Sequence, residues 1–209
     1  MPEKTVQKEP GKKPAPSKKP KPQQEVVVQI SLSELHPFPD HPFQVREDAS
    51  MQETAESVKE YGVLVPALAR PREDGGYELI AGHRRKHACE LAGLATMPVI
   101  VRDIDRDAAT IIMVDSNLQR ENILPSERAK AYKMKMEAIK RQGARTDLTS
   151  PKNSAKFRSD DEVGQDAGVS GDTIRNYIAL TQLVPELQQM VDEKKIALSP
   201  AYQIAALTP

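Results

Sequence analysis

The chain has 209 residues, of which 29% are charged and 38% hydrophobic, and its formal net charge is zero. This length allows two small domains but no large enzyme core, and no apolar run approaches the roughly 20 residues that a membrane span requires. The single cysteine, Cys89, excludes an internal disulfide and a cysteine cluster for zinc, so we expect a soluble cytoplasmic protein with no membrane partner.

Residues 1–24 are rich in Lys, Pro and Gln and contain almost no apolar side chains. Seven lysines and two glutamates give this segment a formal charge of +5, so the rest of the chain carries about −5. Because the segment cannot offset the entropy that it would lose on ordering, we expect a disordered tail. The tail has two interpretations: a solvated charged segment, or an electrostatic arm that binds DNA or a partner ATPase.

A mixed α/β domain is predicted over residues 25–118. Three prolines forbid a helix between His36 and Pro42, which should form an extended loop. Ser50 and Glu53 match a capping box at the start of a helix that Gly62 ends. Hydrophobic periodicity predicts the other elements: strands over residues 26–30, 66–70, 77–81 and 97–101, and helices over residues 83–91 and 106–118.

The chain beyond residue 118 is predicted to be helical, which makes the fold class α+β. Connecting helices occupy residues 119–145, and Pro125 stands in the first turn of a helix that runs to about Gln142. Residues 146–209 should form an all-α second domain, in which a polar loop up to Ser159 precedes four short helices. The outer faces of the long helix should carry its basic residues, Arg128, Lys130, Lys133, Lys135, Lys140 and Arg141.

Residues 161–178 carry a helix-turn-helix pattern. Gly164 is small where two helices approach, and Gly168 can adopt the positive φ of a sharp turn. Val169 and Ile174 supply apolar core positions, and Ser170 can cap the second helix, whose N-terminal end would face base edges in the major groove. The alternative is an ordinary helical hairpin, and the acidic residues of the segment disfavour contact with phosphates.

The DNA-binding residues predicted from this pattern lie in the second helix and just upstream of the first. Arg175 could pair with guanine or a phosphate, and Asn176 with adenine. The full set is Lys156, Arg158, Ser170, Gly171, Asp172, Thr173, Arg175 and Asn176.

The sequence Gly82-His83-Arg84-Arg85 lies between a predicted strand and a predicted helix. Such a junction presents backbone N–H groups and the positive end of a helix, and two arginines can hold phosphate oxygens. We therefore predict a site for the phosphate chain of a nucleotide, with solvated arginines at an ordinary helix start as the alternative.

A second polar cluster, Asn117, Gln119 and Arg120, stands at a helix end. Asn117 and Gln119 could hold a ribose, a base or a metal-bound water, and Arg120 could reach a phosphate. The alternative is a helix terminus that satisfies its own backbone groups.

Taken in order, these motifs resemble the ParB family of plasmid and chromosome partition proteins. The resemblance spans roughly residues 28–209, and sulfiredoxins share the fold of the first domain but are less similar. The motifs are His36-Pro37-Phe38, Gln44-Val45-Arg46, Gly62-Val63-Leu64-Val65-Pro66, Gly82-His83-Arg84-Arg85, Asn117-Leu118-Gln119-Arg120-Glu121-Asn122 and the helix-turn-helix.

The resemblance implies an N-terminal domain that binds CTP with Mg²⁺, a helix-turn-helix domain that binds a parS-like DNA site, and a C-terminal dimerisation domain that we expect this chain to lack. It also implies a dimeric clamp that CTP closes on DNA, and a ParA-type ATPase as partner of the N-terminal tail. By resemblance, the nucleotide-binding residues are Gly82, His83, Arg84, Arg85, Asn117, Gln119 and Arg120, and Asn117 is the candidate contact to Mg²⁺.

Three positions depart from the family pattern, and two of them bear on hydrolysis. The family usually has Glu at the positions of His83 and Ser116, and often Gln at that of Val65. Carboxylates are the natural ligands of Mg²⁺, and only Asp115 and Glu121 remain nearby in sequence. We therefore expect nucleotide binding with slow or absent hydrolysis, and the sequence leaves enzymatic activity undecided.

Two other functions remain open at this point. A nucleoid-occlusion-like protein or a transcriptional regulator would carry similar motifs and differ in its DNA target. A phosphotransferase-type enzyme on the same N-terminal fold is the second alternative. A sulfiredoxin activity is disfavoured because position 82 is Gly, and Cys89 lies within the following predicted helix, away from the loop.

Overall fold

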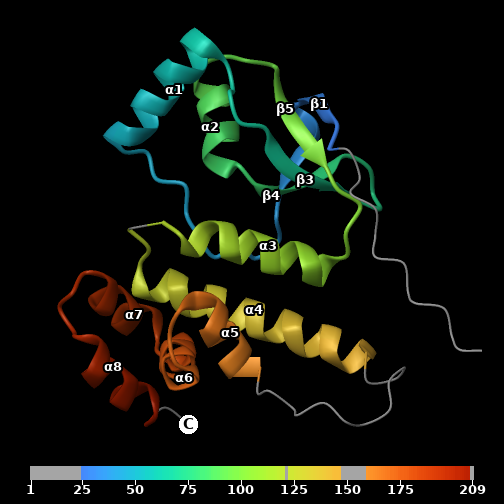
Figure 1. Ribbon diagram of the computed structural model, residues 1–209. Helices are drawn as coiled ribbons and strands as arrows, with labels where there is room; N and C mark the ends of the chain where they lie inside the picture. The colour runs from blue at the N-terminus through green and yellow to red at the C-terminus, as the bar shows by residue number, and fades with distance from the viewer. Residues whose placement is uncertain (1–24, 121, 147–158, 208–209) are drawn as a thin grey trace, which may run out of the picture.

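A computed structural model describes residues 25–120, 122–146 and 159–207. A part that contains the sheet stacks on a wholly helical part, and the long helix α4 (Pro125–Thr146) runs between them (Figure 1). The predicted α+β fold class is confirmed. No helix within these described ranges combines the length and the apolar character that crossing a membrane requires.

Five strands form one mixed sheet: β1 (Val27–Ser31), β2 (Leu35–Pro37), β3 (Ala67–Pro71), β4 (Tyr77–Ala81) and β5 (Thr96–Val101). Their spatial order is β1-β5-β3-β4-β2, with antiparallel pairs β1/β5 and β3/β4 and parallel pairs β3/β5 and β2/β4. Gly75 and Gly76, with φ of 89° and 71°, form the turn between β3 and β4. This turn sets β4 beside β3, and the far end of β4 leads directly into the helix that carries the arginines.

Helices cover both faces of the sheet. Alternate residues of a strand point to opposite faces, and β4 shows this alternation. Leu79 packs in a core with Met51 of α1 (Ala49–Tyr61) and Ala88 of α2 (His83–Leu91), whereas Ile80 packs with Met113 of α3 (Arg106–Leu118). The site motifs therefore lie on helices that are fixed against one sheet from its two sides.

The helical part contains α5 (Ser159–Ala167), α6 (Gly171–Ala179), α7 (Pro185–Asp192) and α8 (Leu198–Ala205). Short 3₁₀ helices, η1 (Leu32–Glu34) and η2 (Leu180–Gln182), complete the described elements. Helix α4 contributes to three cores: Ala131 packs with α3, Ala129 with η2, α7 and α8, and Tyr132 with α5 and α6. It is therefore the element that ties the helix-turn-helix to the sheet-containing part.

Most predicted elements occur, including both short helices of the helix-turn-helix, but several details were wrong. Asp48, not Ser50, caps α1, because its carboxylate accepts the N–H of Met51 at 2.9 Å. The proline-rich loop begins as strand β2, since Pro37 stands at the end of a three-residue edge strand. The long helix continues beyond Gln142, and Lys135 is buried rather than on an outer face. The predicted tail and most of the loop before Ser159 lie outside the described residues.

Candidate functional site

The strand-to-helix junction at Gly82 is built for a residue without a side chain. Gly82 has a φ of 112°, and a Cβ there would lie 2.8 Å from the Cβ of Ala67 on β3. The positive φ lets β4 turn directly into α2. The N-terminus of α2 therefore begins close to the sheet, with its first residues held in place by that packing.

The two arginines of this loop have different surroundings. Arg84 donates to the Ser50 hydroxyl at 3.1 Å and lies 3.7 Å from the Asp48 carboxylate, both at the start of α1. Arg85 instead donates to the carbonyl oxygens of Val65 and Pro66, each at 2.6 Å. Arg85 thus fastens the loop before β3, which is a structural role that the sequence pattern did not reveal.

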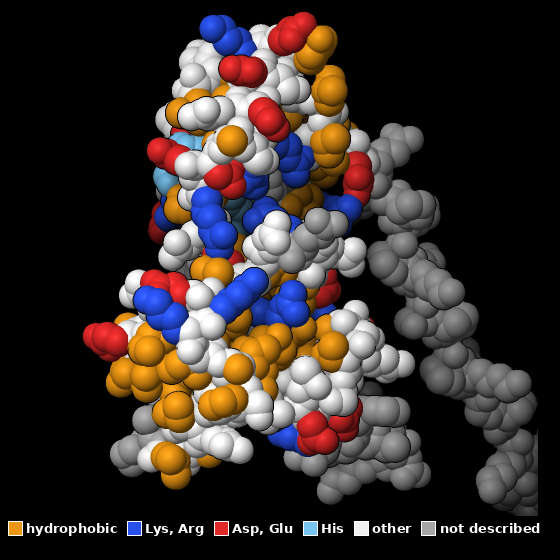
Figure 2. Space-filling view, turned by 90° about the vertical axis from the view of Figure 1, so that its left-hand side faces the viewer, with side chains coloured by type: hydrophobic (Ala, Val, Ile, Leu, Met, Phe, Trp, Pro, Cys, Tyr) orange, Lys and Arg blue, Asp and Glu red, His pale blue; other side chains and the backbone are white. Residues whose placement is uncertain are grey.

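Arg120, just after α3, lies near enough to Arg84 for their charges to interact. Burial lowers the pKa of Arg120, and the positive charge of Arg84 lowers it further. Arg120 therefore lies within electrostatic range of Arg84 and of His83, the first residue of α2. Figure 2 shows Lys and Arg side chains gathered where the two parts of the molecule meet. Repulsion between the two arginines would be relieved by a bound anion.

Asn117 is buried in the second polar motif, two residues before an exposed Gln119. Its Nδ2 donates to the carbonyl of Met113 at 2.8 Å, while its buried Oδ1 has no hydrogen-bond partner among the described residues. Buried polar atoms are usually paired, so this oxygen is a free acceptor for a ligand hydrogen or a cation. The structure thus brings Asn117 and Arg120 to the same helix end.

His83 is partly buried and its ring contacts that of His41 in a tilted arrangement, with ring centroids 4.0 Å apart and 49° between the ring planes. Burial lowers the pKa of His83 to about 3, and the charges of His41 and Arg120 act in the same direction. His41, which no sequence motif singled out, has its Nδ1 2.7 Å from the carbonyl oxygen of Phe43, and burial lowers its pKa as well. Since a carbonyl oxygen can only accept, Nδ1 of His41 is the donor.

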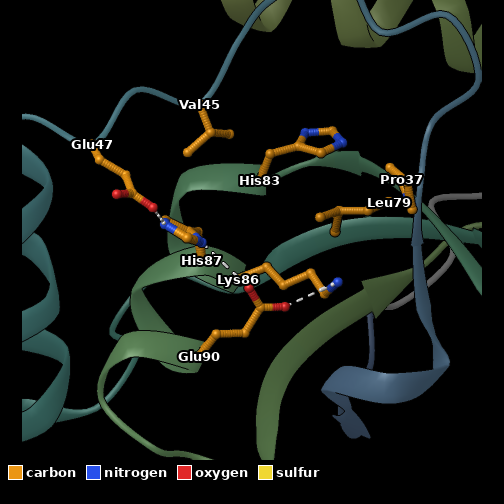
Figure 3. A pocket seen from close by; sticks show the side chains of 8 residues that line it. All are labelled: Pro37, Val45, Glu47, Leu79, His83, Lys86, His87 and Glu90. Atoms are coloured by element: carbon orange, nitrogen blue, oxygen red, sulfur yellow. Dashed lines mark hydrogen bonds and ion pairs between the residues drawn. The ribbon is translucent and has the colours of Figure 1, made fainter.

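A cavity of about 240 Å³ lies beside His83 (Figure 3). His87 stands between Glu47 at 3.4 Å and Glu90 at 3.3 Å in this cavity. The residues of α2 that line the cavity recur every three or four positions and so share one helix face: His83, Lys86, His87 and Glu90. Arg84 belongs to a different face of α2, so it does not line this cavity.

The arrangement fits an anionic phosphate chain better than it fits a metal ion held by the protein alone. Asn117 Oδ1 is one oxygen that could reach Mg²⁺, but Asp115 is engaged by Lys135 at 2.6 Å. Glu121 lies outside the described residues. Across residues 25–120, 122–146 and 159–207, no three His, Cys, Asp or Glu side chains are grouped so that they could hold a metal ion.

The turn between α5 and α6 has the close packing that the helix-turn-helix pattern predicted. A Cβ on Gly164 would lie 2.6 Å from the carbonyl oxygen of Val169, and Gly168 has a φ of 68°. Ser170 caps α6 by accepting the N–H of Thr173 at 3.2 Å, and Ile174 is fully buried. Val169, however, is 38% exposed and is not the core residue that was expected.

The predicted base-contacting residues divide into exposed and packed positions. Asp172, Arg175 and Asn176 are exposed, whereas Gly171 is buried where a Cβ would overlap the side chain of Asp161. The guanidinium of Arg175 forms ion pairs with Asp160 and Asp172. Lys156 and Arg158 lie outside the described residues.

Residues 16–118 match the family model of the ParB N-terminal domain. The chain is 34% identical over 184 residues to the chromosome-partitioning protein Spo0J of Thermus thermophilus, covering 88% of this chain and 61% of that protein. It is 30% identical over 174 residues to a nucleoid occlusion protein of Halalkalibacterium halodurans, covering 83% of this chain and 55% of that one. The chain spans about half the length of the curated relatives it matches.

Among solved structures, the chain resembles C-terminally truncated chromosome-partitioning protein ParB from Caulobacter crescentus in complex with the centromeric parS site. The TM-score is 0.55 at 27% identity, and the match covers 86% of this chain and 84% of that one. The similarity extends through both the sheet-containing part and the helix-turn-helix.

Proposed function

We propose, from the premise that the chain belongs to the ParB family, that it is a partition protein that binds a parS-like DNA site and a cytidine triphosphate. In this proposal, the helix-turn-helix reads the DNA and the junction between β4 and α2 holds the nucleotide. The likeness to a parS-bound ParB across both parts of the chain supports the DNA ligand. The family resemblance supports CTP as the nucleotide.

The observation that carries the nucleotide half is that the charges of Arg84 and Arg120 lie within interaction range of each other at the N-terminus of α2. Like charges held together at a helix N-terminus stabilise a polyanion, because the helix end adds its own positive potential. Each arginine can donate two hydrogen bonds to phosphate oxygens. Gly82 allows the backbone there to come close to the phosphates.

We propose that the bound nucleotide is hydrolysed slowly or not at all. Mg²⁺, when bound with the nucleotide, would neutralise phosphate charge, and Asn117 is the residue that could reach it. Neither His83, neutral because of its depressed pKa, nor Ser116 supplies the carboxylate that would hold the ion firmly. Asp115 is already bonded to Lys135. Binding would then act as a switch without fast turnover.

Isothermal calorimetry with CTP, ATP and GTP, each with and without a parS duplex, tests the proposal. CTP should bind with the highest affinity, and Arg84→Ala and Arg120→Ala should each weaken it tenfold or more. Arg72→Ala is the matched control, because Arg72 pairs with Asp74 in the β3–β4 turn. Absence of binding by every nucleotide at millimolar concentration contradicts the nucleotide half, and phosphate release from CTP measures turnover.

The remaining parts of the proposal concern partners. We propose that the chain acts as a dimer that closes on DNA, and that residues 1–24 contact a ParA-type ATPase through their positive charge. Deletion of residues 2–22 should leave the melting temperature unchanged and reduce stimulation of that ATPase.

The likeness to a nucleoid occlusion protein favours a second candidate function. Competition between parS and unrelated operator duplexes separates the two.

A further inference from the structure

Lys135 lies in the middle of α4 with only 1% of its side chain exposed. Lysine is almost never buried to this extent unless it is paired, because removing an ammonium group from water is costly in free energy. Its Nζ donates to Asp115 at 2.6 Å and to Asp166 at 2.8 Å. The burial is therefore matched by two charge-assisted hydrogen bonds.

The two carboxylates come from different parts of the molecule. Asp115 is on α3, two residues before Asn117 of the nucleotide motif, and Asp166 is near the end of α5, two residues before the helix-turn-helix turn at Gly168. Lys135 on α4 lies between them. A single buried ammonium thus joins the helix of one predicted site to a helix of the other.

Burial alone would lower the pKa of Lys135, but the hydrogen bonds to Asp115 and Asp166 outweigh it and raise the pKa above its ordinary value. The ammonium therefore stays charged at every physiological pH. Both aspartates are about half exposed, so water can solvate either one if it leaves the lysine.

A cavity of about 630 Å³ opens at the same place. Gln119 of the nucleotide motif lines it together with Asp166 and Val169 of the helix-turn-helix turn. The space between Gln119 and the helix-turn-helix turn is therefore open, whereas Lys135 itself is enclosed, and its two ion pairs lie beside this cavity.

We propose that Lys135 is a positioning residue that holds α5 of the helix-turn-helix to the nucleotide-motif helix α3 through Asp166 and Asp115. Breaking the bond to either carboxylate frees one side of the connection and leaves the other intact. Movement at Asn117 and Arg120 is transmitted to the DNA-reading helices through this link. The transmission part rests on the proposed function, whereas the mechanical link does not.

Single substitutions separate the two sides. Asp166→Asn should leave Lys135 paired with Asp115 and weaken its hold on α5, because an amide oxygen accepts a weaker hydrogen bond than a carboxylate does. Asp115→Asn should do the reverse. Lys135→Met removes the ammonium, fills the buried volume and leaves two carboxylates that repel each other. Arg141→Met is the matched control, because Arg141 joins α4 to Asp107 of α3 at 2.8 Å without involving α5.

Hydrogen–deuterium exchange of the uncomplexed protein is the primary measurement. Asp166→Asn and Lys135→Met should speed exchange of the amides of α5 and α6 at least fivefold and leave the strands unchanged. Arg141→Met should not change α5 or α6. Unchanged α5 and α6 in both of the first two variants, with native circular dichroism, would overturn the proposal. Asp166→Asn keeps the lysine paired, so it tests the link even if Lys135→Met does not fold.

DNA affinity with and without CTP is the second measurement. The ratio of the two dissociation constants should move toward 1 in Asp166→Asn and Asp115→Asn and stay unchanged in Arg141→Met. A native ratio in both aspartate variants would overturn the transmission part. If CTP does not bind the unmodified protein, the proposed function fails, and the exchange result still decides whether the link exists.

Discussion

The imidazole of His83 lies against that of His41 with 4.0 Å between ring centroids and 49° between the ring planes. The Nε2 atom of each ring is buried without a hydrogen-bond partner among the described residues. If both imidazoles were protonated, their two positive charges would lie close together and would be poorly solvated. Burial is the main cause that lowers the pKa of His83 to about 3. The first residue of α2 is therefore neutral where a carboxylate would be negative.

This buried pair of histidines predicts a pH-dependent stability. The folded pKa of His83 lies below its ordinary value of 6.5, so the unfolded chain takes up a proton first as the pH falls. The stabilisation is complete above pH 6.5 and is lost progressively toward pH 3. Between pH 7 and pH 5.5, His83 alone should lower the free energy of unfolding by about 1 kcal/mol, measurable by urea titration.

His83→Gln is the control for that prediction, because glutamine does not titrate. The variant should lose stability less steeply between pH 7 and pH 5.5 than the unmodified protein. His41, whose pKa is lowered as well, should leave some of the slope in place. Parallel stability curves for the two proteins would show that His83 is protonated equally in the folded and unfolded states.

Arg84 and Arg85 should separate binding from stability. Arg85→Ala leaves the carbonyls of Val65 and Pro66 without their donor, which should lower the free energy of unfolding by about 1–3 kcal/mol. Arg84→Ala removes the contacts at the exposed start of α1 and also the repulsion with Arg120, so the free energy of unfolding should change by less than about 1 kcal/mol. Thermal unfolding combined with CTP titration checks both, and the opposite order of stabilities would contradict this assignment.

Gly82→Ala should lower the stability of the folded protein, whether or not this junction is the nucleotide site. An alanine would have to adopt a φ of 112° with its Cβ 2.8 Å from Ala67, and such strain costs about 1–3 kcal/mol. Gly143→Ala is the matched control, because a Cβ there meets no heavy atom within 4 Å and the site is helical. That change should stabilise the protein by about 0.5–1 kcal/mol. Equal melting temperatures for the two variants would refute the argument.

The sequence predicted local features well because their causes are local. The bounds of α2 and α3 follow from Gly82 and from the apolar spacing of the helices, and the Ser170 cap needs only the residues after it. A helical pattern identifies a face but not its distant partners. Lys135 was therefore placed on an outer face, although Asp115 and Asp166, 20 and 31 residues away, bury and pair it.

The same limit explains what was missed at the candidate site. The Gly-His-Arg-Arg motif gives Arg84 and Arg85 equal weight, and only the folded chain shows that Arg85 is bound to the loop before β3. His41 comes from a proline-rich segment with no periodicity, so no sequence signal placed it against His83. That Arg120 lies near Arg84 could be expected only from the family resemblance, in which the Gly-His-Arg-Arg motif and the later Asn-Leu-Gln-Arg motif belong to one site.

The ion pairs of Arg175 with Asp160 and Asp172 bear on DNA binding. These aspartates hold the guanidinium near the exposed N-terminal end of α6, and in the proposed function Asp172 would also repel DNA phosphates. Asp172→Asn should therefore tighten binding to parS and to random duplexes alike, because it removes a negative charge facing the backbone. Fluorescence anisotropy at two salt concentrations measures this effect, and weaker binding to both duplexes would mean that Asp172 is needed to position Arg175.

Arg175→Lys keeps the positive charge but removes the planar fork that reads guanine. If Arg175 contacts a base, this variant should bind random DNA almost as well as the unmodified protein and bind parS more weakly by about 1–3 kcal/mol. If it contacts only a phosphate, both affinities should stay near their original values. Arg175→Ala then distinguishes the cases further, since removing a phosphate-binding charge weakens both duplexes equally and lowers the salt dependence by about one counterion. A parS affinity that neither substitution changes would remove this position from the interface.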